Sequence, residues 1–525
     1  MWSKAALPLA VLLASPLGCS AGGSADFSAD GPSLYPGQYG GTSTTSGAPD
    51  SSGTSPPPEA EQNFLLLPPA QTDIYVFITN PDRNTVTRVN VRTLAVDTTP
   101  VGTDPQIVQT TPDYTTAVVF NRGDDSVTLL DADSLDQQTV DVRANFNDLV
   151  LSPDGAWAVL FHNQARERPD DPLVDGLQSF NEISLVRIAT GEHFPMAVGF
   201  NPRMVRFTPD GARAVVVADA YLATIDLTVS EPSPDLIELS PGELNPPTAE
   251  EVIVARDGSF AWVRQFGATE LLVVDLVTGG VLSVPAGTNP TDLDLSADGT
   301  EAIAVARGSQ ELWVYDAAAP VLVPSVLPLP AAAAYGSLLV DPSGDQGVLY
   351  TTAAAVERYA VWERGTDSFV ERSVVKPISG VAVDPTGDTL LVFHTQTDGP
   401  LTDPLFEGEW ALTLIDMEDQ RSNPLRLPGE PTGYANGTDG TWGFFIMEDQ
   451  PFLEVLDYET LLHEQFSLRS LPEFVGVLPE LDPSDGDAPP AWVSQEHELG
   501  RISFFDPDDA SLETLTGFEL NSEIE

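Results

Sequence analysis

The chain has 525 residues, of which 42% are hydrophobic and 8% aromatic, enough for one large core or two medium ones. Asp and Glu number 79 against 23 Lys and Arg, giving a formal net charge of −56. A surface this acidic repels phosphate backbones, which excludes nucleic acid as a partner. It would attract cations and also suits salty surroundings, where charges are screened, so composition leaves salt adaptation and a functional acidic surface both open.

The N-terminus has the pattern of an export signal. Lys4 supplies a positive charge, and the apolar residues 5–18 are too few to span a bilayer but typical of a signal-peptide core. This stretch ends at Leu17-Gly18-Cys19-Ser20, and Cys19 is the single cysteine of the chain, so no intrachain disulfide can form.

Leu17-Gly18-Cys19-Ser20 resembles the bacterial lipoprotein signal. That resemblance implies cleavage after residue 18 and a diacylglycerol on the sulfur of Cys19, hence an envelope protein anchored in a membrane. Ser20, in place of aspartate, implies the outer rather than the inner membrane. An ordinary secretory signal with an incidental cysteine is the alternative.

Residues 19–63 are predicted to be a lipidated cysteine followed by a disordered linker. Residues 20–62 contain no Lys or Arg and are rich in Gly, Ser, Thr and Pro. A flexible coil of this length reaches roughly 35–40 Å on average. Such a linker would hold a folded domain clear of the lipid surface.

From about residue 72 one pattern repeats. An apolar strand leads into a turn, a second strand follows, and a third strand ends in Asp before a fourth. Residues 149–188 show it, with Ser152-Pro153-Asp154-Gly155 as the turn. Related turns occur at 111–113, 208–211, 257–258, 297–299, 341–344, 384–387 and 439–440. Proline, aspartate and glycine favour turns because they preset φ, bond back to the main chain and accept positive φ.

The third strands are expected to end at seven aspartates, namely Asp131, Asp226, Asp275, Asp316, Asp416, Asp457 and Asp506. Asp commonly starts a turn after a strand, so a structural role is favoured over chemistry. Units of 40–55 residues with four short strands are the signature of propeller blades. The sequence therefore predicts an all-β protein, a β-propeller of four-stranded blades.

The first repeats resemble the Tyr-Val-Thr-Asn (YVTN) propeller family, a WD-repeat-like fold. Tyr75-Val76-Phe77-Ile78-Thr79-Asn80 contains that signature with two inserted residues, and residues 101–113 and 286–299 match its continuation. The resemblance covers about 72–515. It implies a propeller, often on exported proteins, and no single reaction.

A longer period indicates a duplication. His162 and His394 are 232 positions apart, and Trp262 and Trp492 are 230 apart within similar sequences. The repeats thus divide into two five-unit halves, 72–285 and 289–525. About ten units are predicted, with seven or eight blades, or two five-bladed rings, as alternatives. The first unit shows no evident first strand, which residues 515–525 could supply by closing the ring.

The usual catalytic, nucleotide-binding and metalloprotease motifs are absent, so no catalytic residue and no evident cofactor is assigned. With five histidines, a multi-histidine metal site is not expected. The acidic run 482–487 lacks the spacing of a calcium loop and is interpreted as a solvated loop.

The best candidate site is a duplicated element in the longest insertion of each half, between second and third strands. Loops presented by a rigid scaffold often carry function. We expect these residues to form a ligand or cation site, with Ca²⁺ as the candidate ion: His162, Gln164, Asp171, Asp175, His394, Gln396, Asp403 and Glu407. The alternative is that both insertions fold back as caps, with histidine bonding loop backbone.

Three functions remain open. The first is a non-enzymatic module that binds protein, glycan or a small ligand. The second is an enzyme, such as a lyase, hydrolase or quinoprotein-like oxidoreductase, with its site at the central channel, because local motifs do not reveal such sites. The third is a structural subunit of an envelope assembly.

Overall fold

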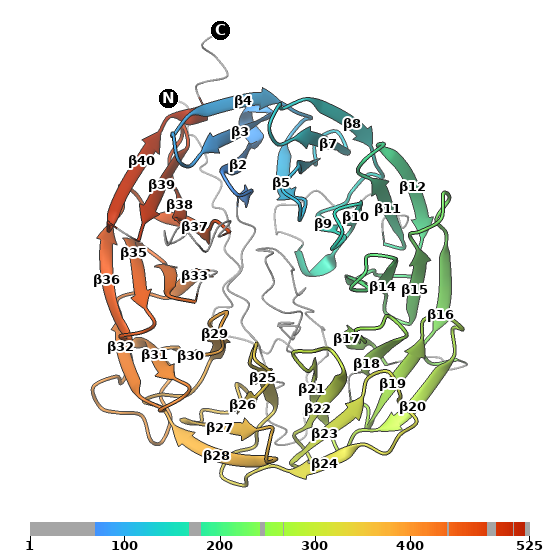
Figure 1. Ribbon diagram of the computed structural model, residues 1–525, viewed down its shortest axis with the longest axis vertical. Coiled ribbons are helices and arrows are strands. Elements are labelled where there is room, and N and C mark those ends of the chain that lie inside the picture. Colours follow the sequence, from blue (N-terminus) through green and yellow to red (C-terminus); the bar gives the residue numbers. More distant parts are fainter. Residues whose placement is uncertain are drawn as a thin grey trace, which may run out of the picture.

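The computed structural model describes residues 69–166, 180–241, 247–265, 267–437, 440–479, 490–507 and 509–519. In these residues the chain forms ten four-stranded antiparallel sheets, each with its strands in chain order. The sheets stand side by side in one closed ring (Figure 1). The predicted propeller of ten units is confirmed, and neither a ring of seven or eight blades nor a pair of five-bladed rings is formed.

The strands of the first five blades follow one another without crossovers. They are β1 Ala70–Gln71, β2 Tyr75–Asn80, β3 Thr85–Asn90 and β4 Val96–Pro100; β5 Pro105–Thr110, β6 Thr116–Asn121, β7 Ser126–Asp131 and β8 Gln137–Asp141; β9 Asp148–Leu151, β10 Trp157–Phe161, β11 Glu182–Arg187 and β12 Glu192–Ala197; β13 Met204–Phe207, β14 Arg213–Val217, β15 Tyr221–Asp226 and β16 Pro234–Glu238; β17 Ala249–Val254, β18 Phe260–Gln265, β19 Glu270–Asp275 and β20 Val281–Pro285. Two short 3₁₀ turns, η1 Pro81–Arg83 and η2 Gln164–Arg166, also lie in this half.

The second five blades have the same order. Their strands are β21 Pro290–Leu295, β22 Glu301–Ala306, β23 Glu311–Asp316 and β24 Ser325–Pro328; β25 Ser337–Val340, β26 Gln346–Tyr350, β27 Arg358–Glu363 and β28 Ser368–Ser373; β29 Gly380–Val383, β30 Thr389–His394, β31 Trp410–Asp416 and β32 Ser422–Leu427; β33 Pro431–Asn436, β34 Trp442–Met447, β35 Gln450–Asp457 and β36 Leu462–Ser467; β37 Pro472–Val477, β38 Ala491–Gln495, β39 Arg501–Asp506 and β40 Ser511–Thr516.

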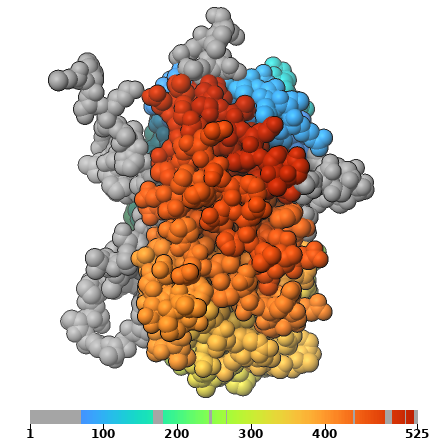
Figure 2. All heavy atoms as spheres, turned by 90° about the vertical axis from the view of Figure 1, so that its left-hand side faces the viewer, coloured from blue at the N-terminus to red at the C-terminus, as the bar shows by residue number. Residues whose placement is uncertain are grey.

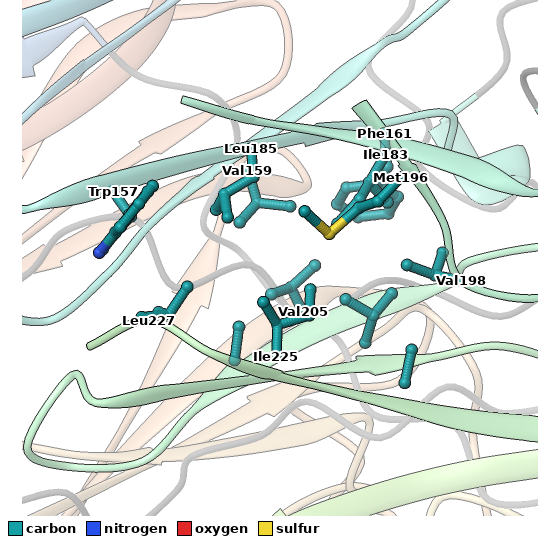
Figure 3. Close-up of a cluster of buried hydrophobic side chains, with 13 residues drawn as sticks. Trp157, Val159, Phe161, Ile183, Leu185, Met196, Val198, Val205, Ile225 and Leu227 are labelled. Atoms are coloured by element: carbon teal, nitrogen blue, oxygen red, sulfur yellow. The ribbon is translucent and has the colours of Figure 1, made fainter. Parts of the chain in front are cut away.

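The core consists of apolar layers between neighbouring blades. Alternate residues of a strand face opposite sides of its sheet, and both faces of a blade are covered. In β10, Trp157, Val159 and Phe161 pack on the fourth blade, as Figure 3 shows. Ala158 and Leu160 of the same strand pack on the second blade. A blade on its own would leave both of these faces in water, so the fold is stable only as a ring.

In six blades the turn between first and second strands has the same hydrogen-bonded frame. Ser152 Oγ donates to Asp154 Oδ1 at 2.5 Å and accepts from the amide of Trp157 at 2.9 Å, while Gly155 takes a φ of +68°. The pairs Thr111/Asp113, Thr208/Asp210 and Ser296/Asp298 bond in the same way. Hydroxyl and carboxylate are exchanged in two blades, where Asp341 and Asp384 accept from Ser343 and Thr386. The frame therefore needs one of each group, in either order.

The aspartates that end the third strands have the predicted structural role. Asp131 Oδ1 accepts the amides of Asp133 and Ser134, at 3.1 and 2.7 Å, and these bonds lower the pKa of Asp131. Equivalent turn bonds are made by Asp226, Asp275, Asp316, Asp416 and Asp457. Asp506 ends β39 in the same position.

The ring closes without a shared strand. The two-residue β1 is the innermost strand of the first blade, so the suggestion that residues 515–525 supply it was wrong. A strand this short has no periodicity to mark it. The last blade instead packs on the first through side chains, with Phe518 and Trp492 against Val76 and Val89. Figure 2 shows the C-terminal blade, in red, lying against the N-terminal one, in blue.

The predicted equivalence of Trp262 and Trp492 is confirmed. Trp262 lies in β18 of the fifth blade and Trp492 in β38 of the tenth, and both side chains are 0% exposed. Each packs on the following blade, Trp262 on the sixth and Trp492 across the closure on the first. Blades five positions apart in the chain therefore use the same large side chain at the same junction.

Candidate functional site

The two histidines of the duplicated element occupy matching positions. His394 is the last residue of β30 in the eighth blade, and His162 directly follows β10 in the third. His394 Nδ1 lies 3.0 Å from the carbonyl oxygen of Pro377, and His162 Nδ1 lies 3.0 Å from that of Asn145. Each acceptor precedes its histidine by 17 residues, in the connection from the previous blade. Both imidazoles therefore bind the backbone that joins two blades.

His394 is held on both ring nitrogens. Its Nε2 lies 2.9 Å from Thr413 Oγ1 of β31, and the side chain is buried. Burial lowers the pKa of His394 to about 4, so the ring is neutral at physiological pH. His162 is likewise buried, with the ring of Phe180 edge-on to it at 4.9 Å. These contacts favour the cap interpretation of the two histidines over a ligand-facing one.

The insertion of the eighth blade, residues 395–409, is fastened by Lys376. This lysine comes from the connection between the seventh and eighth blades and is 0% exposed. Its Nζ donates to Asp398 Oδ1 at 2.8 Å and to the carbonyl oxygens of Phe406 and Glu409, at 2.8 and 2.9 Å. Three donors thus meet three acceptors on one loop, which compensates the cost of burying the charge.

The seventh blade also holds this insertion. The buried carboxylate of Glu357 accepts the amide of Leu401 at 2.8 Å, and the amide of Asp403 donates to the carbonyl oxygen of Val375, also at 2.8 Å. Phe406 is buried beneath the loop. The insertion is therefore a fixed platform on the seventh and eighth blades.

The predicted polar residues of this insertion lie at or near its surface. Gln396 and Glu407 are exposed, and Asp403 uses Oδ1 to accept the amide of Leu405 at 2.9 Å within the loop. The exposed large hydrophobic side chains of the platform are Leu401 and Leu405, at 61% and 71%. Its outward surface thus combines two leucines with carboxylates.

The corresponding insertion of the third blade is fastened differently. Asn163 Nδ2 donates to Asp148 Oδ2 at 2.9 Å, and Arg166 Nη1 lies 3.1 Å from Asp148 Oδ1. Burial raises the pKa of Asp148, and Arg166 opposes that effect. Gln164 is exposed in η2. Asp171 and Asp175 lie outside the described residues, so the calcium prediction remains a prediction.

Sequence reasoning missed Lys376 and Glu357, the two buried charged residues that position the eighth-blade insertion. One feature of the sequence pointed to Lys376. Lys376 and Lys4 are the two lysines of the chain, and Lys4 lies in the export signal. A lone lysine in a chain whose other basic residues are arginines indicates a position where a compact ammonium is needed.

A second polar group lies on inner strands of the fifth and sixth blades and includes Arg203, which directly precedes β13 of the fourth. Arg264 Nε donates to Glu251 Oε2 at 2.5 Å with both side chains buried, and Arg203 Nη1 lies 3.9 Å from Glu250 Oε1. Asp292 Oδ2 accepts the amide of Leu338 at 2.5 Å. Burial, and then the charge of Glu251, raise the pKa of Asp292 well above its ordinary value. Such paired acids and bases are typical both of structural networks and of active sites.

Two further observations bear on location and ions. Cys19 lies outside the described residues, as does the acidic run 482–487. Among the described residues, no helix is long and apolar enough to cross a membrane. Within the same ranges, no three His, Cys, Asp or Glu side chains are grouped so as to hold a metal ion.

Comparison with known proteins identifies the fold. No protein-family model and no curated protein matches the chain. Similar solved structures include a crystal structure of the eukaryotic initiation factor, at 10% identity over 76% of this chain and 97% of that one, with a TM-score of 0.51. Another is dihydro-heme d1 dehydrogenase NirN in complex with DHE, at 16% identity over 67% and 73%, with a TM-score of 0.43. At 10% identity the likeness to the initiation-factor structure concerns the fold alone.

Proposed function

We propose that the protein is a cell-envelope lipoprotein, anchored through Cys19, whose propeller is a binding or scaffolding module for a protein, glycan or small ligand. The export signal, the single cysteine and the linker 19–63 support the anchor. The turn sequences and the residues 75–80, 101–113 and 286–299 support repeats of the YVTN type. Ser20 after the cysteine supports the outer membrane.

The observation that carries the binding role is the platform on the eighth blade, residues 395–409. Lys376 and Glu357 fix it with buried, charge-assisted bonds, yet Leu401 and Leu405 point into solvent. A rigid loop that displays apolar side chains has already lost the conformational freedom that binding would otherwise cost. The neighbouring carboxylates favour a partner with basic as well as apolar groups.

Cross-linking in intact cells tests this role. The full-length protein is isolated after cross-linking, as wild type, as Leu401→Ser/Leu405→Ser, and as Leu462→Ser. Leu462 is a matched control because it is 59% exposed on β36 of the ninth blade. We expect one stoichiometric partner with wild type and the control, and its loss with the double variant. Equal recovery with all three proteins would show that the platform is not the binding surface.

Membrane attachment is tested by Cys19→Ala. The variant should move from the detergent phase to the soluble fraction, because it cannot be lipidated. Ser20→Asp should keep the protein membrane-bound but shift it towards the inner membrane. A Cys19→Ala protein that remains in the detergent phase would eliminate the lipoprotein proposal while leaving the platform experiment unaffected.

One observation favours a second candidate, an enzyme such as a lyase, hydrolase or quinoprotein-like oxidoreductase with its site at the ring centre. The innermost strands β17 and β21 contribute Glu251 and Asp292, with Arg264 paired to Glu251. If this group is catalytic, activity found in broad substrate screens should fall strongly in Glu251→Gln and be unaffected in Leu401→Ser. Activity equal to wild type in Glu251→Gln would place the chemistry elsewhere.

A further inference from the structure

The outermost strands of the blades differ in charge. Such a strand has one unpaired edge, and charged side chains there discourage pairing with other proteins. In eight blades the outermost strand carries at least one charged residue: Asp97, Asp141, Glu192, Asp235, Glu371, Arg426, Glu464 and Glu513. The two exceptions, β20 with the sequence VLSVP and β24 with SVLP, belong to the adjacent fifth and sixth blades.

The uncharged region extends beyond these two strands. Residues 276–291 and 317–340 contain no Asp, Glu, Lys or Arg, in a chain with 102 such residues. We call the exposed part of these two segments the neutral rim. Figure 1 shows β20 and β24 as neighbours on the outside of the ring.

The neutral rim is also where exposed apolar side chains gather. It holds seven of the thirteen exposed large hydrophobic residues found among the described positions: Val277, Val281, Leu282, Val321, Leu322, Val323 and Val326. Val321 and Val323, in the connection from β23 to β24, are 81% and 94% exposed. Apolar side chains this exposed, grouped on two neighbouring blades, mark an interaction surface rather than scattered surface residues.

The charge of the chain indicates which partner the neutral rim would bind. In a two-fold dimer the same surface patch of both copies meets, so with a net charge of −56 almost any contact would set carboxylates against carboxylates. The neutral rim supplies no carboxylate of its own, so repulsion there comes from its margins, as at Glu270, whose Oε2 accepts from Ser283 Oγ at 2.6 Å. Charges further away are screened beyond roughly 8 Å at physiological salt. A basic partner would instead be attracted to the acidic remainder of the surface.

We therefore propose that the neutral rim is a homodimer interface, in which the fifth and sixth blades of one copy pack on those of a second copy around a two-fold axis. The prolines that flank β24, Pro324 and Pro330, together with Pro328 within it, remove amide donors from this edge. The contact is accordingly made by side chains and not by continuation of a sheet. A two-fold contact of this kind closes on itself and does not lead to a polymer.

Sedimentation of the full-length protein in detergent, with the detergent mass subtracted, tests this proposal. Wild type should pass from monomer to dimer as concentration rises. Val323→Asp places two carboxylates in a two-fold interface and should raise the dissociation constant by roughly 100-fold or more. Leu462→Asp, at an exposed leucine on the charged strand β36, should leave it unchanged. Because Val323 is almost fully exposed, the variant should keep the wild-type melting temperature at concentrations where both proteins are monomeric.

Three results would overturn the proposal. The first is wild-type protein that stays monomeric at every concentration. The second is a dimer that Val323→Asp does not weaken, and the third is a dimer that Leu462→Asp weakens equally. None of them bears on the eighth-blade platform, so this proposal and the proposed function can fail separately.

Discussion

The indole N–H of Trp492 in the tenth blade donates a hydrogen bond to the side-chain oxygen of Gln71 in the first. The side-chain nitrogen Nε2 of Gln71 donates in turn to the carbonyl oxygen of Val477. The main-chain oxygen of Gln71 accepts from Thr110 Oγ1 of the second blade at 2.5 Å. One buried side chain thus connects the two ends of the fold.

Replacing this residue should weaken the ring. Gln71→Leu keeps the volume but leaves the Trp492 N–H and the Val477 carbonyl buried without partners, which should cost about 2–5 kcal/mol of unfolding free energy. Urea denaturation measures this change in unfolding free energy. Gln138→Leu is the control, because Gln138 also bonds a neighbouring blade, through the carbonyl oxygen of Thr190, but is exposed. Equal effects of the two variants would argue against a special role for the closure.

The two tryptophans should be energetically equivalent as well as structurally so. Trp262→Ala and Trp492→Ala each empty a buried junction between blades and should each cost roughly 3–5 kcal/mol. Trp442→Ala, at a partly exposed position in β34, should cost less. A near-neutral Trp492→Ala would mean that the ring does not depend on packing at its closure.

The repeat could be predicted from the sequence because most blades repeat the same local chemical requirement. The hydroxyl–carboxylate turn frame and the aspartate after the third strand need particular residue types within a few positions, so they leave a pattern. The duplication could be predicted from the sequence for a related reason. Trp262 and Trp492 occupy equivalent positions, as do His162 and His394. The contacts there are made by side chains, so the same residue type recurs in both halves of the sequence.

The ring closure at Gln71 and the platform on the eighth blade could not be predicted from the sequence. Their contacts join residues of common types that lie far apart in the chain. Gln71 bonds residues 406 and 421 positions away, and β1 is too short to show alternation. Lys376 bonds one side chain and two carbonyl oxygens. A carbonyl acceptor leaves no trace in a sequence, since every residue supplies one.

Loss of Lys376 should release the platform. Lys376→Met removes the buried ammonium and leaves the carbonyl oxygens of Phe406 and Glu409 without it, which should cost about 2–4 kcal/mol. Hydrogen exchange should speed up in residues 398–409 while the strands of the eighth blade keep their protection. Glu407→Gln, at an exposed position of the same loop, is the control. Unchanged exchange in Lys376→Met would show that Glu357 and Phe406 suffice.

The paired insertions also predict a response to calcium. In every blade the connection from second to third strand begins on the same face, and His162 and His394 begin these connections in the third and eighth blades. We therefore expect the two insertions to face the same side of the ring. Asp171, Asp175, Asp403 and Glu407 would concentrate negative charge there. Calorimetric titration of wild type with Ca²⁺ should give binding heat that Asp171→Asn/Asp403→Asn removes and Asp419→Asn retains. No heat with wild type, or equal heat with the double variant, would leave the cap interpretation.

The buried His394 should make stability depend on pH. The pKa of His394 is about 4 in the folded protein against 6.5 for an unperturbed histidine, so between these values the unfolded chain binds the extra proton. The contribution of the neutral ring is complete above about pH 6.5 and is lost as pH falls towards 4, a change of about 3 kcal/mol. Replacing His394 with Gln should therefore flatten the pH dependence of the urea midpoint in this window.

His463 provides a control of opposite sign. A hydrogen bond from its Nδ1 to Glu454, 2.9 Å away, raises the pKa of His463. Its contribution is therefore complete below pH 6.5 and is lost as pH rises through the raised pKa. His463→Gln should lower the free energy of unfolding at acidic pH and have its smallest effect at alkaline pH. His394→Gln should instead reduce the loss of stability on acidification. If both variants shifted the pH profile in the same direction, burial would not be what keeps His394 neutral.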